Sequence, residues 1–211
     1  PGFLKEMCPR LVATDTVWCP WLDAVADAGC LPFLSGRVAN LVGVDILHHL
    51  ERPIVFLREA ERVLAVGGRL ILVEPWITPF SYLIYRYLHQ EGCDLKALPW
   101  EGSATAGKKP LDGNLAVPYL MFYSQGLAKT LSLIPGFRLI RLEAFCLFAY
   151  LFSLGFWRMS LLPNRLYPFV SRWEHRTHPV WKNLAALRAC IVLEKQGAAP
   201  APEPAPQPVG R

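Results

Sequence analysis

The stretch NLVGVDILHHLERPIVFLREAERVLAVGGRLILVEP, residues 40–75, decides the fold. It begins with an apolar run at 40–47, which is typical of a buried strand. Between Ile54 and Ala65 the period changes, because apolar side chains fall on one face of a helix and charged side chains on the other. The apolar run at 69–75 then indicates a second buried strand. Together they predict a βαβ unit in a parallel sheet.

Glycine and proline mark the ends of these elements. Gly67-Gly68 is expected to stop the helix, because glycine tolerates the positive φ of a helix C-cap. After the second strand, Thr78 and Pro79 stand where a helix favours its N-cap and its first turn. A further helix is therefore expected from Pro79 onward.

Similar patterns extend in both directions from this unit. On the N-terminal side, 11–15 (LVATD) and 24–28 (AVADA) each predict a short strand. On the C-terminal side we expect a loop or lid, a helix, a strand after Pro135-Gly136 and a last strand: 91–118, 119–133, 137–145 and 187–195. The Ala/Pro-rich segment 197–211 has little to bury and is predicted to be a disordered tail, so the expected domain covers residues 1–196.

Composition limits the partners of the chain. With 211 residues, 53% of them hydrophobic and 18% charged, the chain is expected to fold as one domain. The net charge is +5, but lysines and arginines are scattered rather than gathered into a basic stripe. Nucleic acid is therefore not an expected partner, and no obligate protein partner is evident.

Cysteines and histidines give no sign of a metal centre. The six cysteines are far apart and form no C-x-x-C pair, which argues against a zinc site and against a disulfide framework. Reduced thiols indicate a cytoplasmic protein. Adjacent His48 and His49, just past a strand, are expected to point in different directions and so not to share a metal.

Several short motifs in this region occur together in one known family. The motifs are Leu31-Pro32-Phe33, Leu47-His48-His49-Leu50, Glu59, Arg62-Val63-Leu64 and Gly67-Gly68, with acids at Asp15 and Asp27. In this order they resemble the class I S-adenosylmethionine-dependent methyltransferases, and more narrowly a type 11-like group. The resemblance covers about residues 11–76 and is loose between 77 and 186.

The resemblance implies a fold, an activity and a cofactor. The fold is α/β, a three-layer sandwich with a Rossmann-like, mostly parallel sheet and an antiparallel C-terminal strand. The activity is methyl transfer from S-adenosylmethionine. The resemblance assigns Asp15 to the ribose, Asp27 and the Ala28 backbone to the adenine, and Asp45-Ile46 to the methionine part.

The resemblance also implies that the start of this fold is missing. Pro1-Gly2 looks like the end of a Gly-rich loop, so that Gly2 would contact the cofactor and the first strand would precede residue 1. That strand would lie between the strands ending at Asp15 and Asp45, and its absence would leave their edges unpaired. Val66 replaces the usual proline before the two glycines.

The methyl acceptor is predicted to bind where the parallel strands end, because ligands of such sheets lie outside the carboxyl ends of the strands. His49, Tyr85 and His89 are the candidate catalytic residues, with the loop from Glu91 to Pro118 forming the rest of the pocket. A general base is needed only if the acceptor must lose a proton. The acceptor itself, a small molecule or a lipid-like compound, stays unassigned.

Two other interpretations fit the same sequence. One is a non-catalytic methyltransferase-like protein or an inactive fragment. The other is a membrane-surface methyltransferase, because the aromatic run at 145–157 has arginines nearby that suit an interface: Arg158, Arg165, Arg172 and Arg176.

Overall fold

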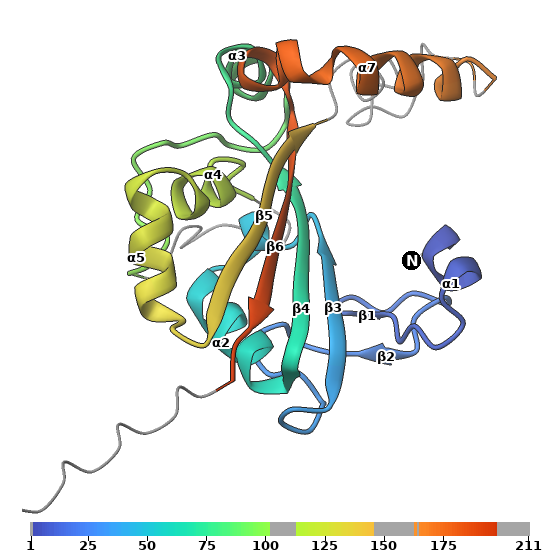
Figure 1. The fold of residues 1–211 in the computed structure, drawn as a ribbon, viewed down its shortest axis with the longest axis vertical. Coiled ribbons are helices and arrows are strands. Elements are labelled where there is room, and N and C mark those ends of the chain that lie inside the picture. Colours follow the sequence, from blue (N-terminus) through green and yellow to red (C-terminus); the bar gives the residue numbers. More distant parts are fainter. Residues whose placement is uncertain (1, 102–112, 146–162, 164, 198–211) are drawn as a thin grey trace, which may run out of the picture.

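The computed structural model describes residues 2–101, 113–145, 163 and 165–197 (Figure 1). The chain order of the elements is α1 Gly2–Met7, β1 Thr14–Asp15, β2 Ala24–Val25, β3 Val38–Val44, η1 Leu47–His49, α2 Pro53–Val63, β4 Leu64–Pro75, α3 Pro79–Tyr87, α4 Val117–Phe122, α5 Gln125–Leu133, β5 Phe137–Phe145, α7 Tyr167–Ala185 and β6 Arg188–Lys195. Most of the 145–157 run and of the tail lies outside the described residues.

The main sheet has four strands in the order β3-β4-β6-β5. β3 and β4 are parallel, whereas β6 runs antiparallel to both of its neighbours, β4 and β5. β3, β4 and β5 therefore share one direction and β6 opposes them. This confirms the prediction of a mostly parallel sheet with an antiparallel C-terminal strand.

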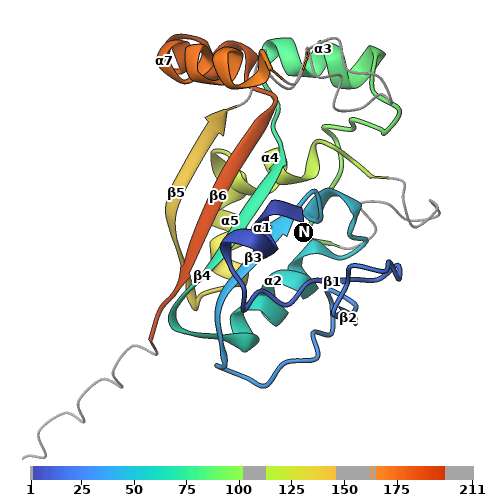
Figure 2. The same cartoon turned by 90° about the vertical axis from the view of Figure 1, so that its right-hand side faces the viewer.

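Helices α2, α4 and α5 lie against one face of this sheet (Figures 1 and 2). The main core joins Leu57 of α2, Leu72 of β4, Phe122 of α4 and Ile191 of β6, all of them nearly or fully buried. α3 and α7 lie together beyond the sheet, where Tyr85 belongs to a second, smaller core. None of the helices described is long and apolar enough to cross a membrane.

Strands β1 and β2 form a small parallel sheet of their own. β1 ends at Asp15 as predicted, whereas β2 covers only Ala24–Val25 of the expected 24–28. Among the strands described, β1 pairs with β2 alone and β3 with β4 alone, so the strands do not share one sheet. One edge of β1 and one edge of β3 are therefore unpaired among the described strands, as expected.

The role predicted for Gly67-Gly68 is wrong. Helix α2 already ends at Val63, and the two glycines lie within β4. There they form a bulge: Val38 pairs with Leu64, whereas Asn40 pairs with Arg69, so β4 has extra residues at this point. Gly67 adopts a φ of +77°, and a Cβ at Gly68 would lie 2.8 Å from the carbonyl oxygens of Ala39 and Ala65. Glycine is thus required by a bulge rather than by a helix end.

The single helix predicted for 119–133 is also wrong. The structure has two helices, α4 and α5, separated at Tyr123–Ser124. Ser124 has a φ of +49°, which no helix residue adopts. By contrast, the cap predicted for α3 is confirmed: the Thr78 hydroxyl accepts from the Ser81 N–H at 3.1 Å, and the Ser81 hydroxyl accepts from the Thr78 N–H at 2.7 Å.

Helix α2 also holds the segment with the LPF motif. Glu59 accepts a hydrogen bond from the Leu31 N–H at 2.8 Å, and Arg62 donates to the carbonyls of Leu31 and Phe33 at 3.2 and 3.0 Å. Arg62 and Glu59 also form an ion pair at 2.6 Å. The side chains of Glu59 and Arg62 thus bind the backbone of the LPF motif, which explains why the motif and the pair occur together.

Candidate functional site

The candidate site begins where β3 ends. Asp45, directly after β3, has a φ of +52°, and this left-handed residue turns the chain into the short 3-10 helix η1. Aspartate tolerates this backbone conformation better than most residues. The turn brings His48 and His49 over the end of the neighbouring strand β4, which ends at Pro75.

A fully buried carboxylate on β4 fixes this turn. Glu74 accepts hydrogen bonds from the backbone N–H groups of Ile46 and Leu47 at 2.9 and 2.8 Å. Its other oxygen lies 2.7 Å from Nδ1 of His48. Every oxygen of Glu74 thus has a partner, as a buried charge requires.

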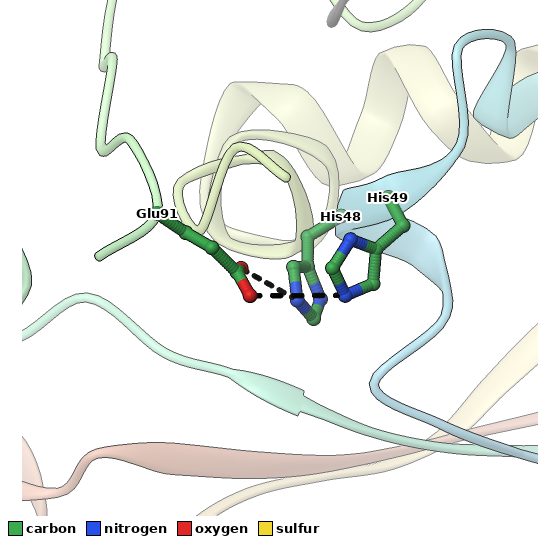
Figure 3. A group of neighbouring side chains, drawn as sticks. All are labelled: His48, His49 and Glu91. Carbon is green, nitrogen blue, oxygen red and sulfur yellow. Dashed lines mark ion pairs between the residues drawn. The ribbon is translucent and has the colours of Figure 1, made fainter. Parts of the chain in front are cut away.

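His48 lies between two carboxylates. Nδ1 faces Glu74, and Nε2 lies 3.4 Å from Oε2 of Glu91 (Figure 3). Burial favours the neutral ring, but the bonds to Glu74 and Glu91 outweigh it and raise the pKa of His48 to about 9. The His48 ring is therefore a cation at neutral pH in this arrangement.

His49 lies against His48 rather than turning away from it. The ring centroids are 4.2 Å apart, and Nε2 of His49 is 4.0 Å from Oε1 of Glu91. The expectation that the two rings diverge is wrong, because η1 keeps both on the side of Glu91. Burial, and then the charge on His48, lowers the pKa of His49, which favours its neutral form.

Two loop segments are held together around these rings by Asn114. The Asn114 side chain accepts from the Asp94 N–H at 2.9 Å and donates to the Asp94 carbonyl at 3.1 Å, and its backbone N–H donates to the His48 carbonyl at 2.9 Å. Asn114 is 1% exposed. The described parts of the predicted lid are thus ordered by side-chain and backbone bonds at the site.

Of the other two predicted catalytic residues, His89 lies beside the cluster and Tyr85 lies deeper. Nδ1 of His89 accepts from the Glu91 N–H at 3.1 Å, and burial lowers the pKa of His89. Tyr85 is 3% exposed, its ring meets that of His89 edge to face, and its hydroxyl donates to the Leu187 carbonyl. Tyr85 thus joins α3 to the start of β6.

Asp45 is held by a residue that is distant in sequence. Arg188 of β6 donates to Oδ1 of Asp45 at 2.6 Å and to the Val73 carbonyl at 3.1 Å. The Arg188 side chain is 10% exposed and that of Asp45 is 42% exposed. Arg188 therefore spans from β6 across β4 to the turn after β3.

The residues predicted to bind cofactor lie at the carboxyl ends of three strands and at the chain start. Asp15 is exposed and accepts from the Val17 N–H at 3.1 Å, and Asp27 is exposed and accepts from the Gly29 N–H at 2.8 Å. Ala28 is 8% exposed. Ile46 contributes its N–H to Glu74, and Gly2 is the first residue of α1.

Sequence reasoning missed three residues that build the site, namely Glu74, Asn114 and Arg188. A signal existed for Glu74, because a carboxylate inside the apolar run LILVEP must find buried partners. Asn114 and Arg188 gave no comparable signal. Their partners are far from them in sequence, so only the fold brings them together.

Residues 6–72 match a family model described as a methyltransferase domain. Residues 6–72 therefore belong to a methyltransferase domain. The matched segment extends from α1 into β4 and includes Asp15, Asp27, Asp45 and both histidines. The resemblance found in the sequence is thereby confirmed. No curated protein matches the chain.

Solved structures share the fold of this methyltransferase domain. A SAM-dependent methyltransferase from Archaeoglobus fulgidus is 15% identical, with a TM-score of 0.53 over 92% of this chain and 81% of that chain. At this identity the likeness shows the fold alone. It is the mixed α/β, Rossmann-like fold with one antiparallel strand that the resemblance implied.

Two further structures are similar over most of this chain. The [4+2]-cyclase SpnF is 16% identical (TM-score 0.41, 83% of this chain), and a putative methyltransferase in complex with the Haloferax volcanii Trm112 activator is 12% identical (TM-score 0.44, 84% of this chain). The chain spans 57% and 62% of the length of these two proteins.

Proposed function

We propose that this protein transfers a methyl group from S-adenosylmethionine to a small-molecule or lipid-like acceptor. The observation that carries the proposal is the family match over residues 6–72. It includes the three strands whose ends hold candidate cofactor residues and the turn with the two histidines. The cofactor follows from the same family.

The cofactor side of the proposed site consists of acids at strand ends. Asp15, at the carboxyl end of β1, would accept hydrogen bonds from the ribose hydroxyls, since a carboxylate in this place is a fixed acceptor. Asp27 and the Ala28 backbone would meet the adenine. Asp45-Ile46 and Gly2 would border the methionine part, and the bond from Arg188 would hold Asp45 in place.

The acceptor side of the proposed site is the cluster of His48, His49 and Glu91, together with His89. These residues lie beyond the carboxyl ends of β3 and β4, where parallel sheets bind their ligands. Methyl transfer is an in-line displacement, so the protein contributes mainly by aligning the acceptor. We assign His49 and His89 to the wall of this pocket, and Tyr85 to its support, because its hydroxyl already bonds to Leu187.

A calorimetric titration with S-adenosylmethionine tests the proposal. We expect saturable binding, and we expect Asp15→Ala to weaken it by about 1.5–3 kcal/mol, the range for losing hydrogen bonds to a charged group. Glu143→Ala is the control, since it also removes a partly exposed carboxylate but on β5, outside the assigned residues. A dissociation constant that is equal in Asp15→Ala and the wild-type protein would contradict the assignment.

A further inference from the structure

The side chains of His48, His49 and Glu91 bring three potential metal ligands together. The ligand atoms of these residues lie within 4.8 Å of one another. We propose that His48, His49 and Glu91 form a binding site for one divalent transition-metal ion, with Zn²⁺ the expected ion. This departs from the sequence-based expectation, which rested on diverging histidine rings.

The spacing of the ligand atoms suits a small ion. Zn²⁺ binds imidazole nitrogen and carboxylate oxygen at about 2.0–2.2 Å in tetrahedral geometry, so two of its ligand atoms are about 3.3–3.5 Å apart. Nε2 of His48 and Oε2 of Glu91 are 3.4 Å apart. Nε2 of His49 and Oε1 of Glu91 are 4.0 Å apart, so this pair would close by about 0.5–0.7 Å on binding the ion.

His48 is oriented as a metal-binding histidine usually is. Such a histidine bonds through its second ring nitrogen to a carboxylate or carbonyl, which fixes the ring and makes the ligand more basic. Glu74 takes this role at Nδ1 of His48, at 2.7 Å, and is itself fixed by two backbone N–H groups. Glu74 is therefore an orienting residue in the proposed site, and Nε2 of His48 is the ligand atom, which releases its proton when the ion binds.

Two buried atoms of the cluster have no hydrogen-bond partner among the residues that the structure describes. They are Nδ1 of His49 and Oε2 of Glu91, whose 3.4 Å contact with Nε2 of His48 is an ion pair without hydrogen-bond geometry. A buried polar atom without a partner is costly, and a bound ion is one of the few explanations for it. Glu91 Oε2 gains its partner directly from the proposed ion. One ring nitrogen of His49 lies within 4.8 Å of the other two ligand atoms, so His49 can join them at the ion.

The space around the three ligands is kept by glycine. A Cβ at Gly113 would lie 2.8 Å from Oε2 of Glu91, 2.8 Å from Cδ2 of His48 and 3.1 Å from Nδ1 of His49. Any larger residue at this position would push the three side chains apart. Asn114, the next residue, joins this segment to His48 through its backbone N–H.

The ligand types select the ion. Two imidazoles and one carboxylate suit Zn²⁺ and related transition metals, whereas Mg²⁺ and Ca²⁺ prefer oxygen ligands alone. Three protein ligands also leave a coordination position open, as in catalytic rather than structural zinc sites. If the proposed methyl transfer holds, the open position faces the acceptor pocket and selects an acceptor with a hydroxyl oxygen, because a bound metal lowers the pKa of a coordinated hydroxyl.

Metal binding is measured on the protein alone, without S-adenosylmethionine or acceptor. Calorimetric titrations with ZnCl₂ and MgCl₂ follow removal of metals with a chelator. We expect one Zn²⁺ to bind per chain and Mg²⁺ to bind far more weakly. Titration with Co²⁺ is expected to give the visible absorption of a low-coordinate complex with nitrogen and oxygen ligands.

Variants locate the ion. Glu91→Gln and His49→Gln are each expected to weaken Zn²⁺ binding at least tenfold, and Glu74→Gln to weaken it about 10–100-fold through His48. Glu143→Gln, a matched change in a carboxylate on β5 that is 41% exposed and lies outside the assigned residues, is expected to leave it unaltered. Thermal melts of each variant show whether it is folded.

Two results would overturn the proposal. One is a wild-type protein that binds no Zn²⁺. The other is equal Zn²⁺ affinity in folded Glu91→Gln, His49→Gln and wild-type proteins, because the ion would then bind elsewhere, for example at exposed thiols such as Cys8 and Cys30. Since Asp15→Ala tests cofactor binding and Glu91→Gln tests metal binding, either proposal can fail while the other stands.

Discussion

At the carboxyl ends of β3 and β4 the acid of the site, Glu74, is completely buried, whereas at the end of β1 the corresponding acid, Asp15, is exposed. Glu74 binds two backbone N–H groups and His48, all of them distant in sequence. Asp15 accepts from Val17, two residues along the chain. The proposed acceptor side is therefore anchored to the core through Glu74, whereas Asp15 and Asp27 of the proposed cofactor side lie in surface turns. A mutation of Glu74 should accordingly lower the free energy of unfolding, whereas a mutation of Asp15 should mainly lower cofactor affinity.

The largest effect is expected from Glu74→Ala. It leaves the buried His48 ring without its main charged partner, and breaking a buried charged pair typically costs about 3–5 kcal/mol. Urea unfolding is the measurement, with exposed Glu101→Ala as the control. A loss of less than about 1 kcal/mol would mean that Glu74 is no more important to folding than a surface acid.

The next effect is a dependence of stability on pH. The pKa of His48 is raised from 6.5 to about 9, so between these values the folded protein holds a proton that the unfolded chain has released. This stabilisation is complete below pH 6.5 and is lost as the pH rises through about 9. The free energy of unfolding should fall by about 2–3 kcal/mol over this range.

His48→Gln is the variant that checks this effect, by urea unfolding of the metal-free protein at a series of pH values, because an ion bound at Nε2 would exclude the proton. It is expected to lose the fall between pH 6.5 and about 9. Burial raises the pKa of the Cys93 thiol to about 11, so a further loss above pH 9 should appear in both proteins. A His48→Gln profile that overlays the wild-type profile between pH 6.5 and 9 would refute the assignment.

The smallest effect on folding is expected from Asp15→Ala. Its hydrogen bonds are exposed and local, so the free energy of unfolding should change by less than about 1 kcal/mol. Cofactor affinity, in contrast, should fall as proposed above. A variant that unfolds as easily as Glu74→Ala would show that the contrast between the two sides is wrong.

How much of this could be foreseen depended on how far apart in sequence the interacting residues are. The strand after Val38, helix α2 and the cap at Thr78 were predictable because each depends on neighbouring residues. Gly67-Gly68 was misplaced, since glycine suits a strand bulge as well as a helix end. Whether the two glycines end a helix or form a bulge depends on how this segment pairs with β3, and the local sequence does not reveal that pairing.

The candidate site shows the same limit. His49 could be chosen because it follows a predicted strand, and His89 because it shares one face of the predicted helix after Pro79 with Tyr85. The arrangement of these side chains could not be predicted, because it depends on contacts that Glu74, Glu91 and Asn114 make around η1. The two histidines were expected to diverge on general grounds. The short 3-10 helix instead places their rings together.

The bond between Arg188 and Asp45 has a consequence for the order in which the protein folds. Its two ends are 143 residues apart, and Arg188 belongs to β6, the strand inserted between β4 and β5. On a ribosome, β3, β4 and β5 therefore all emerge before the strand that joins β4 to β5. Contacts over such separations are slow to form, and waiting strand edges invite wrong pairing. The turn that carries both histidines would reach its final form only when β6 docks.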